Sequence, residues 1–186
     1  MWWHPPATPA WRPGMFSLHS AATATLCDML AQRVPVEYPE GAFIAGLFHD
    51  LGKLLIANEL PRVYEVLRTM DGGEENVIQT SEAELAGITH AELSAAALER
   101  WKLPPPIRKA VLDHHSPEKR TGEQRSLGEI VHYADRGIKA FGIVVSPSRR
   151  PTESCEQILE EAGAGAHASR IAEELRQEVQ LLQELF

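Results

Sequence analysis

The residues best suited to chemistry are histidines and aspartates in apolar surroundings. The pair His49-Asp50 lies inside the stretch Ile44-Ala-Gly-Leu-Phe-His-Asp-Leu-Gly-Lys-Leu-Leu-Ile. A carboxylate there needs a strong partner, because leaving a buried polar group unpaired costs about 1–3 kcal/mol or more. Lys53 could serve, and so could a cation. A neutral imidazole nitrogen beside a hard carboxylate oxygen suits divalent first-row metals.

Further histidines and one more aspartate lie at predicted helix ends or in apolar helical stretches. The candidate metal ligands are His19, His49, Asp50, His90, His114, His115 and Asp135. Each also has a structural interpretation. A lone buried histidine is more often a hydrogen-bonded core residue than a ligand, the pair His114-His115 could cap a helix C-terminus, and Asp135 could lie on the surface. His132, three residues before Asp135, could support it by a hydrogen bond.

Helical periodicity accounts for the segments that must position these residues. Apolar and small residues recur at helical spacing from Phe16 to about Gln32. The segment 40–56 is apolar almost all round, which predicts one buried central helix. Other helices are predicted at 61–70, from 80 onward, at 90–101, 104–115, 127–139, 152–161 and 167–185. Since no stretch alternates polar and apolar residues with a period of two, the predicted fold class is all-α.

Composition narrows the class of protein. The chain of 186 residues, with 44% hydrophobic and 24% charged residues, is typical of a soluble domain. Eighteen basic and 26 acidic residues leave a formal net charge of −8, which argues against a broad nucleic-acid contact. The two cysteines suggest no disulfide framework, the N-terminus lacks a secretory pattern, and no apolar run reaches the ~18 residues of a membrane span. We therefore expect a bacterial-type cytoplasmic protein.

Taken together, the candidate ligands and their neighbours resemble the HD superfamily of metal-dependent phosphohydrolases, and within it the HDOD branch, the HD-related output domains. The matching words are His19-Ser-Ala-Ala-Thr-Ala, Gly46-Leu-Phe-His-Asp-Leu-Gly-Lys-Leu, Gly87-Ile-Thr-His-Ala-Glu-Leu, Trp101-Lys-Leu-Pro, His114-His-Ser-Pro and Ile130-Val-His-Tyr-Ala-Asp. The resemblance covers about residues 15 to 140. It implies an HD-domain-like helical bundle with a metal site among its central helices.

The resemblance also implies a ligand set for one or two divalent ions. In the basic HD pattern one metal is held by the positions that match His19, His49, Asp50 and Asp135. The HD-GYP branch, which cleaves cyclic di-GMP, holds a second metal at the positions that match His90, His114 and His115, with the aspartate of the pair bridging. Mixed nitrogen and oxygen ligands favour Fe, Mn, Zn, Ni or Co. Lys53 matches a lysine that positions the scissile phosphate, so Lys53 and Asp50 are the candidate catalytic residues.

Two departures bear on function. After the paired histidines the chain reads His115-Ser-Pro-Glu-Lys-Arg-Thr-Gly, where HD-GYP proteins have an acidic residue and a Gly-Tyr-Pro loop, and this argues against cyclic di-GMP hydrolysis. HDOD proteins also usually carry a helical N-terminal half, and only residues 1–15 stand there. We therefore expect a signalling output domain that binds metal and contacts protein partners.

Two alternatives stay open. The first is a metal-dependent phosphohydrolase acting on a nucleotide or another phosphate ester, in which a divalent ion would lower the pKa of bound water toward ~7 and Arg108 or Lys109 could help Lys53 to neutralise the phosphate. The second is a structural bundle whose polar cluster satisfies itself without metal.

We expect three regions along the chain. Residues 1–14, with four prolines and three tryptophans, should be irregular, residues 15–145 should form the metal-binding domain, and residues 146–186 should form a helical extension packed on it. Trp2, Trp3 and Trp11, together with the amphipathic tail 167–186, leave a homodimer or a docking surface open beside packing within one subunit.

Overall fold

Helices make up the regular structure of the chain. The computed structural model describes residues 13–70, 75–118, 122, 124–145 and 151–186. In chain order the elements are α1 (Pro13–Ala31), the 3-10 helix η1 (Pro39–Gly41), α2 (Ala42–Phe48), α3 (Leu51–Glu59), α4 (Pro61–Thr69), α5 (Glu75–Ala86), α6 (His90–Arg100), α7 (Pro105–Asp113), α8 (Leu127–Ala140), α9 (Cys155–Glu161), the 3-10 helix η2 (Gly165–His167) and α10 (Ala168–Gln183). The described residues contain no strand, only one isolated parallel bridge between Val36 and Arg125. The prediction of an all-α fold is confirmed.

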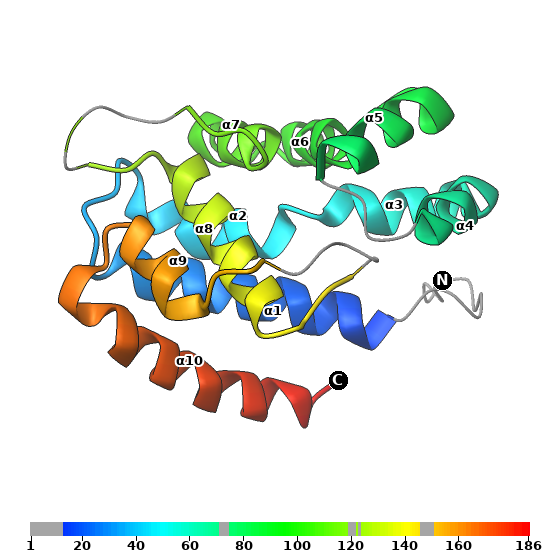
Figure 1. Ribbon diagram of the computed structural model, residues 1–186. Helices are drawn as coiled ribbons and strands as arrows, with labels where there is room; N and C mark the ends of the chain where they lie inside the picture. Colours follow the sequence, from blue (N-terminus) through cyan, green and yellow to red (C-terminus); the bar gives the residue numbers. More distant parts are fainter. Residues whose placement is uncertain (1–12, 71–74, 119–121, 123, 146–150) are drawn as a thin grey trace.

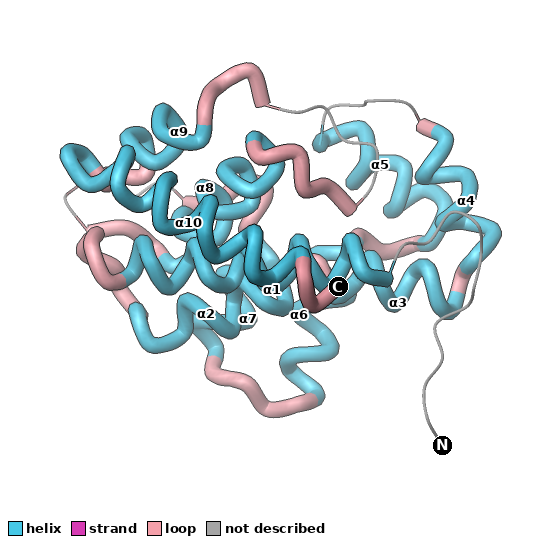
Figure 2. Tube along the Cα trace, turned by 90° about the horizontal axis from the view of Figure 1, so that it is seen from below, coloured by secondary structure: helices cyan, strands magenta, loops and turns pink. Residues whose placement is uncertain are grey.

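The helices form a layered bundle around α2 and α8. In Figure 1, α1 and α10 lie along one side, α6 and α7 lie along the other, and α2 and α8 run between them. α1 packs against α2, α8 and α10, while α6 packs against α3 and α7. Figure 2, seen from below, shows α4 and α5 at one end of the molecule and α9 toward the other. Elements far apart in the sequence therefore meet at α1, α2 and α8.

One apolar core runs through most of the molecule. It contains fully buried residues from α1, α8, α9 and α10, including Leu26, Ile130, Ile158, Ile171 and Leu175. α9 and α10 thus share their core with the helices before them. A smaller apolar cluster is formed by Ile56 and Ala57 of α3 and Tyr64 of α4. Within the described part of the chain, no helix combines the length and the apolar character that crossing a membrane requires.

Several helix predictions were wrong at their boundaries. The predicted single helix 40–56 is interrupted at His49-Asp50, where Asp50 adopts φ −101° and ψ 10° between α2 and α3. α5 begins at Glu75, so Thr80 lies inside a helix. α1 begins at Pro13, so the last two residues of the expected irregular segment are helical. The rest of that segment lies outside the described residues.

Candidate metal centre

All seven predicted ligands lie together in two clusters. We call His19, His49 and Asp135 the Asp135 cluster, and Asp50, His90, His114 and His115 the His90 cluster. Within each cluster the candidate ligand atoms all lie within 4.8 Å of one another. They come from α1, the turn between α2 and α3, the first residue of α6, the turn after α7, and α8. All are buried except His115, which is partly exposed.

Asp50 joins the two clusters, because its two oxygens face different sides. Its Oδ2 lies 3.7 Å from Nε2 of His19 and 3.5 Å from Nε2 of His49. Its Oδ1 lies 3.4 Å from Nε2 of His90 and 3.9 Å from Nε2 of His114. A carboxylate placed in this way can bridge two cations, one on each side.

Four of the histidines share the same support behind the ring. In each, Nδ1 contacts an oxygen, and the pairs are His19 with Ile143 O (2.9 Å), His49 with Gly46 O (2.8 Å), His90 with Glu82 Oε2 (2.6 Å) and His114 with Val111 O (2.7 Å). Because an oxygen without a proton can only accept, these contacts assign the proton to Nδ1. The lone pair of each Nε2 is therefore directed into the centre, as in metal-ligating histidines.

As far as the described residues go, three polar atoms at the centre are buried without a hydrogen-bond partner. They are Oδ1 of Asp50, Nε2 of His114 and Oδ1 of Asp135. Buried polar atoms are nearly always paired, so three orphans at one place call for an explanation such as an ion that accepts their lone pairs. The donor set of imidazole nitrogens and carboxylate oxygens fits a divalent first-row metal.

Two buried lysines balance the two carboxylates. Nζ of Lys53 lies 2.8 Å from Oδ2 of Asp50, and Nζ of Lys139 lies 2.7 Å from Oδ2 of Asp135. Burial raises the pKa of Asp50, but His49 and Lys53 outweigh it and hold that pKa well below its usual range. Burial likewise raises the pKa of Asp135, and Lys139 is the strongest of the groups that bring it well below its usual range. Both carboxylates are thus ionised at neutral pH.

The histidines differ in how readily they take up a proton. Burial holds the pKa of His114 and of His115 well below the usual range. Burial also opposes the charge on His49, but Asp50 and Asp135 outweigh it and raise the pKa of His49. His114 and His115 are therefore neutral imidazoles at neutral pH, whereas a cation entering beside His49 displaces a proton more often.

Gly46 lets α2 approach the helix that carries His19. A Cβ added at Gly46 would lie 2.8 Å from Sγ of Cys27 and 2.9 Å from Cα of Ala24, both on α1. Those distances are too short for any side chain. The glycine therefore allows α1 and α2 to pack closely enough for His19 and His49 to face each other, with ring centroids 5.3 Å apart.

Gly52 and Ser94 bring α3 against α6. A Cβ added at Gly52 would lie 2.0 Å from the carbonyl oxygen of His90. The backbone N–H of Gly52 donates to Oγ of Ser94 (2.7 Å), and this hydroxyl lies 2.8 Å from His90 O and 3.1 Å from His49 O. One serine thus connects the His49-Asp50 turn with the first turn of α6, where the side chain of Thr89 caps the helix.

Other predicted supporting residues act differently from expectation. Nδ1 of His132 donates to the carbonyl oxygen of His114 (2.9 Å), so it holds the turn after α7 and not Asp135. Arg108 donates to Glu99 (2.6 Å) and Lys109 to Asp113 (2.6 Å), both exposed ion pairs. Sequence reasoning missed Glu82, which gave no local signal. It also missed Lys139, although its place four residues after Asp135 in a predicted helix was a usable signal.

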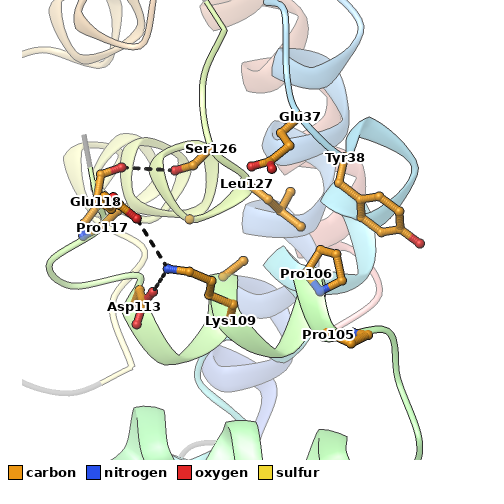
Figure 3. Close-up of a pocket in the computed structure, with 12 residues that line it drawn as sticks. Glu37, Tyr38, Pro105, Pro106, Lys109, Asp113, Pro117, Glu118, Ser126 and Leu127 are labelled. Carbon is orange, nitrogen blue, oxygen red and sulfur yellow. Dashed lines mark hydrogen bonds and ion pairs between the residues drawn. The ribbon is translucent and has the colours of Figure 1, made fainter. Parts of the chain in front are cut away.

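Two of the pockets in the described part of the chain bear on the question of access to the centre. Figure 3 shows a pocket of about 360 Å³ in which Lys109 reaches toward Asp113 and Glu118, and none of its lining residues belongs to either cluster. A much smaller pocket of about 20 Å³ adjoins the centre, and Lys53 and Tyr64 are among the residues that line it. That volume holds about one water molecule.

Comparisons with known proteins agree with this architecture. An uncharacterized protein from Treponema pallidum (strain Nichols) is 25% identical over 130 residues, which cover 70% of this chain and 24% of that protein. A solved, provisionally named phosphohydrolase from Shewanella amazonensis SB2B is 26% identical, with a TM-score of 0.69 over 96% of this chain and 65% of that chain. An HDOD domain protein of unknown function from Geobacter sulfurreducens has the same fold, with 23% identity and a TM-score of 0.69 over 95% of this chain and 63% of that chain.

The chain therefore spans about a quarter of the curated relative and less than two thirds of each of these solved chains. The family model of the HDOD domain matches residues 8–117, which is more than half of the chain. This match agrees with the resemblance in sequence and with the helical fold. The chain belongs to the HDOD domain family.

Proposed function

We propose that this chain is a cytoplasmic output domain of signal transduction that holds divalent metal and acts by contacting protein partners. The observation that carries the proposal is the set of three orphaned atoms on Asp50, His114 and Asp135. Within the described residues, these atoms lack hydrogen-bond partners at the place where the imidazole nitrogens of the two clusters converge. A cation is the simplest ligand that satisfies all of them.

The donor set has room for two ions. His19, His49 and Asp135, with Oδ2 of Asp50, would hold one, and the His90 cluster, with Oδ1 of Asp50, would hold the other. A divalent ion supplies positive charge and Lewis acidity at this place. Lys53 and Lys139 keep the carboxylates ionised and oriented whether or not an ion is present. Fe, Mn, Zn, Ni and Co all suit these donors.

Occupancy of the centre would be felt by the whole bundle. The ligands stand on elements that are up to 116 residues apart in the sequence, from His19 on α1 to Asp135 on α8. An ion that binds only the folded chain at 100 times its Kd stabilises it by about 2.7 kcal/mol. Metal occupancy would therefore change how firmly α1, α6 and α8 are held together, and a partner in contact with these helices could respond to it.

A metal-dependent phosphohydrolase is the second candidate function. It is favoured by Lys53, which lies beside Asp50 as the resemblance requires, and by the name of the Shewanella relative. The described pocket beside the centre holds about one water, which leaves no room in that pocket for a nucleotide or other phosphate ester. The output domain is therefore the better-supported proposal.

Two measurements test the proposal. Elemental analysis of protein purified without added metal, and again after dialysis against Mn²⁺, Fe²⁺ or Zn²⁺, should find at least about one equivalent per chain. Asp50→Asn should lose it, while Asp28→Asn, an exposed change on α1, should not. Less than half an equivalent after dialysis would refute metal binding. Turnover of a phosphoester panel that Asp50→Asn abolishes would favour the hydrolase instead.

A further inference from the structure

We infer that the two clusters bind cations unequally, and that the His90 cluster binds the first and tighter ion. The inference rests on the proposed metal binding and adds an order to it. It comes from charged side chains that are not themselves candidate ligands but contact the ligands. These side chains are Glu82 at the His90 cluster, and Lys53 and Lys139 at the Asp135 cluster.

Glu82 reinforces the His90 cluster. Its Oε2 accepts from Nδ1 of His90 at 2.6 Å and from the backbone N–H of the same residue at 2.8 Å, and its side chain is only 3% exposed. A carboxylate behind a ligating imidazole fixes the ring and raises the basicity of its Nε2, and losing such a partner typically weakens metal binding 10- to 100-fold. The cluster also offers three imidazoles, so a cation meets more nitrogen donors here.

The Asp135 cluster is opposed by positive charge. In the described part of the chain, the groups behind its two imidazoles are the backbone carbonyls of Ile143 and Gly46. Nζ of Lys53 contacts Oδ2 of Asp50, and Nζ of Lys139 contacts Oδ2 of Asp135. A cation held by Oδ2 of Asp50 must therefore share that oxygen with an ammonium group. Like charges this close repel strongly in a buried site. An ion should therefore bind here more weakly.

The lysines are not confined to one side in their effect. They also lower the pKa of His115, although burial and the neighbouring histidines lower it more. At the His90 cluster, however, the carboxylate of Glu82 opposes their field, whereas the described contacts place no such extra carboxylate behind His19 or His49. The difference between the clusters comes from this balance.

The experiment is a titration of the chelator-stripped full chain with Co²⁺, followed by visible absorption and by calorimetry. We expect two steps that differ at least tenfold in Kd. His19→Ala should keep the tight step, and His114→Ala should lose it. These two variants assign each step to a cluster through the spectrum of the bound ion, without any measurement of catalysis.

Two charge variants then test the cause. Glu82→Gln should weaken the tight step 10- to 100-fold and leave the other unchanged, with Glu84→Gln, on the exposed side of the same helix, as its control. Lys139→Met should tighten the weak step at least tenfold, with the exposed change Lys109→Met as its control. Lys139→Met also serves if Glu82→Gln does not fold, because it acts on the other cluster.

The possible outcomes separate the two proposals. Three outcomes would overturn the order while leaving metal binding intact. The first is two steps of equal affinity, and the second is a tight step that survives His114→Ala but not His19→Ala. The third is a titration that neither Glu82→Gln nor Lys139→Met changes. If the wild-type chain binds one Co²⁺ ion, and His114→Ala loses it while His19→Ala keeps it, the order is supported. Failure of the wild-type chain to bind Co²⁺ would overturn the proposed function together with this inference.

Discussion

Replacing Gly52 with alanine tests how closely α3 must approach α6 for the centre to form. The added Cβ would lie 2.0 Å from the carbonyl oxygen of His90 and 2.7 Å from its Cα and carbonyl carbon. All three are backbone atoms, and real Cβ contacts essentially never fall below 3.0 Å. The two helices would have to separate by about 1 Å, because a backbone cannot swing aside as a side chain can.

That separation has a cost that can be estimated. Overpacking costs about 1–3 kcal/mol. The bond from Gly52 N–H to Ser94 Oγ would lengthen from 2.7 Å beyond hydrogen-bond range, and an unsatisfied buried donor costs about 1–3 kcal/mol more. We expect the free energy of unfolding to fall by about 2–6 kcal/mol in total. His90 would move away from Asp50 as well, so metal affinity should fall at least tenfold.

Urea unfolding of Gly52→Ala and of a matched variant checks this reasoning. Gly128 is the second residue of α8, as Gly52 is of α3, but the nearest atom to its added Cβ is a side-chain carbon of Pro117 at 3.5 Å, an ordinary contact. Helix propensity alone predicts that both changes stabilise by about 0.5–1 kcal/mol. If Gly52→Ala proves as stable as Gly128→Ala, close approach of the backbones does not hold the centre together.

Three more results are expected. Ser94→Ala should lower the free energy of unfolding by about 1–3 kcal/mol, because Gly52 N–H loses its buried acceptor; urea unfolding at pH 7 with no loss would contradict this. Burial keeps the pKa of His114 and His115 well below 6.5, so the unfolded chain binds more protons than the folded chain below that pH. The stability of the metal-free protein should therefore fall from pH 6.5 to 5 by up to about 1.4 kcal/mol per pH unit for each histidine. A urea midpoint that stays constant or rises as the pH is lowered over that window would rule this out. Leu175→Ala in α10 should cost about 2–5 kcal/mol in a single calorimetric transition, whereas the exposed change Leu181→Ala should stay within about 0.5 kcal/mol; two transitions would mean that α10 unfolds separately.

Local patterns in the sequence were enough to predict most of the helices, and with the family resemblance they singled out the candidate ligands. The capping box at Thr89 and Glu92, which begins α6 at His90, depends only on residues three apart. Asp50 was recognisable because a carboxylate amid apolar residues needs a partner wherever the chain folds. Such features depend on neighbours within about one helical turn, and the order of residues encodes them directly.

Only the tertiary structure decided which distant groups support those ligands. The contact from Nδ1 of His19 to Ile143 O spans 124 residues, and no periodicity announces it. Glu82 was expected near a helix start, yet it reaches His90 across the turn between α5 and α6. The break of the central helix at Asp50 has the same origin, since close packing at Gly46 and at Gly52 places α2 against α1 and α3 against α6. The sequence names the groups that could bind a cation, whereas long-range packing sets the charges around them.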